Sequence, residues 1–120
     1  MTQFEPRDAL PLGAATFYIL LSLAGGERHG YAIGKEVDEQ TGGTVKLGPA
    51  TLYRLIKQLL GDGWIVEVEP PDDDDERRRT YRLSPRGRAV ARVEAKRLED
   101  LVNVARARRL LPAHAGGVGA

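Results

Sequence analysis

The spacing of apolar and polar residues predicts helices in the first half of the chain. Apolar residues are almost continuous over residues 12–23, so we expect a helix that is buried on most of its circumference and ends at Gly25-Gly26. A second helix is expected to open at His29-Gly30 and to end at Thr41-Gly42-Gly43. The next residues, 44–47, are expected to form a short strand.

A third helix has the clearest periodicity and starts at Gly48-Pro49, where a proline suits the first turn. One face carries apolar residues at i, i+3, i+4, i+7 and i+8, namely Leu52, Leu55, Ile56, Leu59 and Leu60. The opposite face is polar and cationic, and it comprises Thr51, Arg54, Lys57 and Gln58, with Tyr53 at its flank. Gly61-Asp62-Gly63 ends the helix. This division is typical of a helix that buries one side and leaves the other outside.

A hairpin is expected after the third helix. Residues 64–69 alternate apolar and polar side chains and predict one strand, and residues 77–83 predict the strand that returns. Between them, Pro70-Pro71 and the acidic run at residues 72–76 form the tip. We interpret the tip as a solvated loop with arginines at its base.

The last helix is long for a chain of this size. Ser84-Pro85 provides a cap and a first turn, and the helix is expected to run for roughly 27 residues, to Leu111. A modest apolar seam at i, i+3, i+4 and i+7 comprises Leu98, Leu101, Val102 and Ala105. A seam of this kind at the end of a chain usually packs on a partner helix, so we expect these residues to form a dimer interface.

Charge is segregated along the 120 residues, although the net charge is only +1. Residues 1–71 contain six Lys and Arg against nine Asp and Glu, a balance of −3. The acidic run adds −5, and residues 77–111 contain twelve Lys and Arg against three acids, a balance of +9. A segregated basic half is consistent with a polyanion partner, and equally with a solvated, arginine-rich helix.

Composition excludes several classes of site. Without cysteine, the chain has no disulfide, thiolate metal site or thiol nucleophile. The longest apolar stretch, residues 14–24, is too short to span a membrane and follows no basic segment, so we expect a soluble, cytoplasmic protein. Capping of a helix start explains His29, so we expect no catalytic site. The acidic run lacks the spaced ligands of a calcium loop, and we expect neither a metal site nor a cofactor.

The order of these elements predicts a fold that is mainly α-helical with a small β-hairpin. The second and third helices form a helix-turn-helix unit, and the hairpin that follows corresponds to the wing of a winged helix. We expect an N-terminal arm (1–11), a winged helix-turn-helix DNA-binding domain (12–84), a C-terminal dimerisation helix (85–111) and a disordered tail (112–120).

Five motifs within residues 12–90 occur in a specific order and spacing. They are Ile19-Leu20-Leu21-Ser22-Leu23, His29-Gly30-Tyr31-Ala32-Ile33, Gly48-Pro49-Ala50-Thr51-Leu52-Tyr53-Arg54-Leu55-Ile56-Lys57-Gln58-Leu59, Gly63-Trp64-Ile65 and Arg79-Thr80-Tyr81-Arg82-Leu83-Ser84-Pro85-Arg86-Gly87. Together they resemble the PadR-like transcriptional regulators. The chain is similar to the shorter subfamily, in which a single C-terminal helix replaces a larger domain.

The resemblance implies a homodimeric repressor that binds a palindromic, inverted-repeat operator and releases it on meeting a small aromatic or drug-like molecule. Two features depart from the family pattern. The acidic run is heavier than the usual wing tip, which argues against deep insertion of the tip into the minor groove. The C-terminal helix has no tryptophan for an aromatic ligand cage.

We expect double-stranded DNA to contact the third helix and the wing. Arg54 is expected to reach a base edge and Lys57 a phosphate, because a guanidinium can bind guanine in bidentate fashion whereas an ammonium is a point charge. The full expected set is Tyr31, Thr51, Tyr53, Arg54, Lys57, Gln58, Arg77, Arg78 and Arg79. Tyr53 could instead be a core residue, Tyr31 could pack against the third helix, and the charged residues could be solvated side chains. The alternative function is a winged-helix protein–protein interaction module that does not bind DNA.

Overall fold

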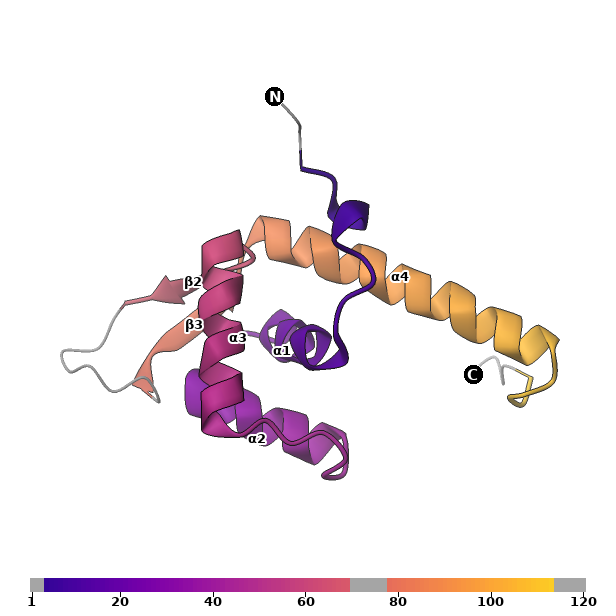
Figure 1. Cartoon of the computed structure of the whole chain (residues 1–120), viewed down its shortest axis with the longest axis horizontal. Helices are drawn as coiled ribbons and strands as arrows, with labels where there is room; N and C mark the ends of the chain where they lie inside the picture. The colour runs from indigo at the N-terminus through magenta and orange to yellow at the C-terminus, as the bar shows by residue number, and fades with distance from the viewer. Residues whose placement is uncertain (1–3, 70–77, 114–120) are drawn as a thin grey trace.

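Four α-helices and one small antiparallel sheet make up the part of the chain that the computed structural model describes, residues 4–69 and 78–113 (Figure 1). The elements, in chain order, are the 3-10 helix η1 (Pro6–Ala9), α1 (Ala14–Ala24), β1 (Arg28–His29), α2 (Gly30–Gln40), α3 (Pro49–Asp62), β2 (Ile65–Val68), β3 (Thr80–Leu83) and α4 (Pro85–Ala107). The sheet order is β1-β3-β2. The expected mainly α-helical winged-helix fold is therefore confirmed. The acidic run, Arg77 and residues 114–120 lie outside the described residues.

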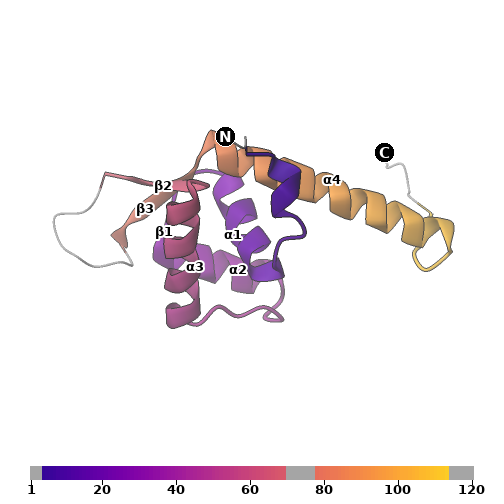
Figure 2. The ribbon, with the colours of Figure 1, turned by 45° about the horizontal axis from the view of Figure 1, so that its top comes forward.

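The core gathers around α1, which lies between α2 and α4 and also contacts β3 (Figures 1 and 2). Ile19 and Leu20 are completely buried, but Leu21 is 40% exposed, so α1 is buried on less of its circumference than expected. The apolar face of α3 packs on this core as its periodicity predicts. Its members Leu52, Leu55, Ile56 and Leu59 are buried, while Leu60 is only partly so.

The expected strand at residues 44–47 is wrong, because this segment is an irregular connection between α2 and α3. Hydrogen bonds of the Thr41 side chain stabilise the start of this connection. The Thr41 hydroxyl donates to the carbonyl of Val37 at 2.8 Å and accepts from the amide of Val45 at 3.1 Å. The additional strand is β1, which pairs with β3 in the register Arg28↔Tyr81 and His29↔Thr80.

The start of α4 is attached to the wing by the capping serine that the sequence predicts. Ser84 Oγ accepts from the amide of Gly87 at 3.0 Å and donates to the carbonyl of Gly63 at 2.6 Å, and the amide of Ser84 donates to the carbonyl of Trp64 at 3.0 Å. A Cβ at Gly87 would lie 1.9 Å from the Trp64 carbonyl oxygen. Only glycine allows this approach, so α4 begins directly against Trp64, the residue that precedes β2.

The two ends of the described chain differ from expectation. The N-terminal arm contains η1, which packs on α4, and α1 begins at Ala14 rather than near Leu12. The last helix ends at Ala107, four residues before Leu111, and Arg109 adopts a positive φ of 62° beyond its end. Even so, the second half of α4 extends past the other elements of the head (Figures 1 and 2).

Candidate nucleic-acid interface

The polar face of α3 is open to solvent along its length. Thr51, Arg54, Lys57 and Gln58 are all exposed. No carboxylate among residues 4–69 and 78–113 forms an ion pair with Arg54 or Lys57. Tyr53 is partly buried and packs against the core. The structure thus brings the four expected polar residues onto one exposed helix face, with the Tyr53 ring at its edge.

A surface hollow of about 510 Å³ lies between α2 and α3. Its lining includes Tyr31, Lys35, Lys46 and Tyr53. Tyr31 is 61% exposed and lines the hollow beside residues of α3, so the structure leaves open both expected roles of this residue, a phosphate contact and packing against the third helix. The hollow therefore places two phenols, two ammonium groups and the carboxylate of Asp38 next to the cationic face of α3, so its lining has a small excess of positive charge.

The arginines at the base of the wing are partly neutralised. Arg78 is exposed, whereas Arg79 Nε lies 3.8 Å from Glu67 Oε2 of β2. Arg82 Nη1 lies 3.8 Å from Glu27 Oε2. Both pairs are long and partly exposed, so they weaken the local positive potential without removing it. The sequence does not indicate these pairs, because β2–β3 pairing brings Glu67 to Arg79 and β1–β3 pairing brings Glu27 to Arg82.

His29 does more than precede a helix start. His29 occupies the N-cap position of α2, as expected, but its side chain makes no capping hydrogen bond to the helix. The ring Nδ1 instead lies 3.1 Å from the carbonyl oxygen of Arg78 and 3.1 Å from Thr80 Oγ1. Sequence reasoning missed this contact because the partners are about fifty residues away.

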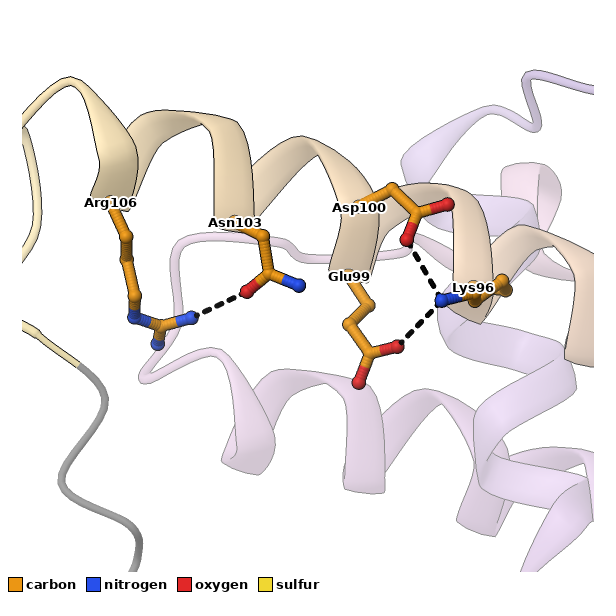
Figure 3. Close-up of polar contacts among 5 residues, drawn as sticks. All are labelled: Lys96, Glu99, Asp100, Asn103 and Arg106. Carbon is orange, nitrogen blue, oxygen red and sulfur yellow. Dashed lines mark hydrogen bonds and ion pairs between the residues drawn. The ribbon is translucent and has the colours of Figure 1, made fainter.

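On α4, the expected seam is only partly covered. Leu98, Val102 and Ala105 are half-buried, but Leu101 is 57% exposed. Val104, which the seam did not include, is 56% exposed. The other side of the helix is polar, with Lys96 between Glu99 and Asp100, at 3.4 and 2.9 Å, and Asn103 bonded to Arg106 (Figure 3). The end of α4 is thus amphipathic, with apolar side chains that the head does not cover.

A buried carboxylate attaches α4 to the start of α1. Glu94 is 1% exposed, and its Oε2 accepts from the amide of Leu12 and from Arg97 Nη2, both at 3.0 Å. The hydrogen bonds from Arg97 hold the pKa of Glu94 below its usual value, helped by the Leu12 amide and against the opposing effect of burial. The sequence signal was available, since Glu94 lies four residues before Leu98 on the inward face of the helix.

Other classes of site find no support in the described part of the chain. No helix there is long and apolar enough to cross a membrane. Residues 4–69 and 78–113 also contain no cluster of three His, Asp or Glu side chains that could hold a metal ion.

A hollow of about 390 Å³ between α1 and α4 has Phe17, Leu21 and Leu98 in its lining.

Comparison with known proteins agrees with this geometry. The sequence profile of the transcriptional regulator PadR-like family matches residues 19–93, which is 75 of the 120 residues. No curated protein matches the sequence.

Solved structures with the same fold include two clostridial regulators. A transcriptional regulator from Clostridium thermocellum is 22% identical, with a TM-score of 0.64 over 80% of this chain and 96% of that one. A PadR family transcription regulator from Clostridium difficile is 21% identical, with a TM-score of 0.65 over 78% of this chain and 96% of that one. Bacillus subtilis PadR in complex with operator DNA is 22% identical, with a TM-score of 0.57 over 67% of this chain and 46% of that one.

Proposed function

Because the chain belongs to the PadR-like family of transcriptional regulators, we propose that it is a repressor that binds double-stranded DNA through α3. As a member of this family the protein is a regulator and not an enzyme. The observation that carries the proposal is the division of α3. One face is buried in the core, while Arg54 and Lys57 project from the other without a carboxylate partner in the described chain. A helix with this division fits the major groove.

The roles of the individual side chains follow from their chemistry. Arg54 contacts a base edge, because its planar guanidinium matches the two acceptors of guanine. Lys57 contacts a phosphate, and Thr51 and Gln58 border the same groove. Tyr31, at the start of α2, contacts the DNA backbone through its hydroxyl, a role that its exposure supports.

At the wing, Arg78 and Arg79 add sequence-independent attraction to phosphates. Arg77, proposed with them from the sequence, lies outside the described residues.

The repressor acts as a homodimer through α4. Its 23 residues extend about 34 Å at 1.5 Å per residue, so the helix passes beyond the head (Figure 2). Leu101 and Val104 are each more than half exposed there. A second copy supplies the missing cover for such a face, and a twofold axis repeats the contact on both subunits. Two α3 helices then meet an inverted-repeat operator with half-sites about 34–36 Å apart.

Release by a small aromatic or drug-like ligand completes the proposal. The hollow between α1 and α4 supports it, because Phe17, Leu21 and Leu98 give it an apolar lining. On α4 the hollow is lined by Leu98, a member of the seam through which the dimer is proposed to form, and by the Glu94–Arg97 pair. A ligand in this position could then change the angle between the two DNA-binding heads.

Binding to a duplex selected from a random-sequence pool by the wild-type protein tests the proposal. Arg54→Ala should weaken binding to that duplex by about 1–3 kcal/mol, or about 5- to 150-fold. Lys57→Ala should weaken binding to every duplex alike and flatten the slope of log affinity against log salt by about 0.9. Lys96→Ala, which removes a cation of α4 already paired with Asp100, is the matched control and should change neither.

Two outcomes contradict the proposal. Unchanged affinity in the Arg54→Ala, Lys57→Ala double variant, with wild-type thermal unfolding, would exclude α3 as the DNA-contacting helix. A wild-type protein that binds no duplex at low salt would favour the alternative of a protein–protein interaction module.

A further inference from the structure

Three contacts connect the start of α2 to the base of the wing. The His29 ring lies 3.1 Å from both the Arg78 carbonyl oxygen and Thr80 Oγ1. The amide of Gly30 donates to the carbonyl of Arg79 at 3.0 Å. The paired residues of β1 and β3 extend no further along the wing than Thr80. The His29 side chain therefore reaches past the paired residues of β1 and β3 to the backbone on the other side of Arg79.

The chemistry of this contact determines the form of the ring. A carbonyl oxygen can only accept, so the Nδ1 that meets Arg78 carries a hydrogen. The Thr80 hydroxyl shares that hydrogen as a second acceptor. Both the singly protonated ring with its hydrogen on Nδ1 and the doubly protonated ring satisfy this arrangement. The contact consequently does not depend on charging the ring.

We infer that His29 is a positioning residue for the arginines at the base of the wing. It acts through the backbone: by binding the Arg78 carbonyl, it holds the segment from which the Arg78 and Arg79 side chains project. The inference rests on the proposed function, since these arginines are proposed to meet phosphates. Because His29 immediately precedes α2, the contact also keeps the wing in one orientation relative to the helix-turn-helix unit.

Because the contact is exposed, its effect on arginine position can be distinguished from an effect on folding stability. His29 is exposed and its ring contacts lie at the surface. Hydrogen bonds at the surface add little to folding stability, because water replaces them when they break. Removal of the ring should therefore change where the arginines point much more than it changes whether the head folds.

The experiment compares His29→Ala with His29→Asn, whose carboxamide nitrogen restores a donor on a short side chain. Binding to a 30-base-pair duplex of mixed sequence is measured over a range of salt concentrations, since phosphate contacts act on every sequence. We expect His29→Ala to bind several-fold more weakly and to flatten the salt slope by about 0.9 for each phosphate that the arginines no longer neutralise. His29→Asn should recover both values, and the thermal unfolding of both variants should match the wild type.

A second comparison tests whether the effect of His29→Ala on DNA binding depends on Arg78 and Arg79. In an Arg78→Ala, Arg79→Ala background, adding His29→Ala should have no further effect on affinity or slope, because the side chains it positions are absent.

The inference is overturned if His29→Ala binds with wild-type affinity and slope. It is also overturned if affinity falls together with thermal stability and Asn does not restore it. A wild-type protein that binds no duplex would instead refute the proposed function, so the two failures are distinguishable.

Discussion

Gly87→Ala should destabilise the fold, because Gly87 packs directly against a backbone carbonyl. The added Cβ would lie 1.9 Å from the Trp64 carbonyl oxygen and 2.8 Å from its carbon, whereas real Cβ contacts below 3.0 Å essentially never occur. The first turn of α4 and the residue before β2 must therefore separate by at least 1.1 Å, the difference between 3.0 and 1.9 Å. The Trp64 atom is a backbone carbonyl, so no side-chain rotation relieves the clash.

The cost of that separation can be estimated from the bonds it breaks. The Trp64 carbonyl loses the amide of Ser84, worth about 0.5–1.5 kcal/mol, and the Ser84 cap adds about 1 kcal/mol. Overpacking strain adds about 1–3 kcal/mol, and the better helix propensity of alanine returns up to about 1 kcal/mol. We expect Gly87→Ala to destabilise the fold by about 1.5–5.5 kcal/mol, or about 6–22 °C in melting temperature at ~4 °C per kcal/mol.

Thermal unfolding followed by circular dichroism measures this effect, with Gly61→Ala as the matched control. Gly61 is also helical, but nothing lies within 4 Å of an added Cβ, so this variant should gain about 0.4–1 kcal/mol. A melting temperature of Gly87→Ala equal to the wild type would refute the reasoning. It would mean that α4 can move away from the wing freely, and that the angle between the head and α4 is not fixed in the way the contact requires.

Two further predictions concern α4. Arg97 lowers the pKa of Glu94, so the stability from this carboxylate is present above its unfolded value of about 4.5 and is lost as pH falls below it. In urea unfolding at pH 7, the free energy of unfolding of Glu94→Gln should be about 1–3 kcal/mol lower than that of the wild type. This difference should become smaller below about pH 4.5, and a difference that does not change with pH would contradict the prediction. If the proposed dimer forms through α4, Leu101→Glu with Val104→Glu should yield a folded monomer with weaker DNA binding, because the charges would be buried without partners in the interface. Sedimentation measures the oligomeric state, and Asn103→Glu on the polar face of α4 is the control that should leave it unchanged. A double variant that remains dimeric would place the interface elsewhere.

Local sequence patterns determined most of the helical architecture. The stripe from Leu52 to Leu59 defines α3 because a helix brings every third or fourth residue onto one face without help from the rest of the chain. Ser84 defines the start of α4 in the same way, since a cap and its amide are three residues apart. The division of α3 into a buried and an exposed face, which carries the proposed function, needed no tertiary information.

The tertiary structure decided the contacts between distant residues. β1 exists only because β3 pairs with it, so two residues between helices could not be recognised as a strand. His29 and Thr80 are 51 residues apart, and Leu12 and Glu94 are 82 apart, so no local spacing predicts either contact. The exposure of Val104 likewise depends on where the head ends along α4. Periodicity acts over one or two turns, whereas these features arise when folding brings separate segments together, which is why only the folded chain reveals them.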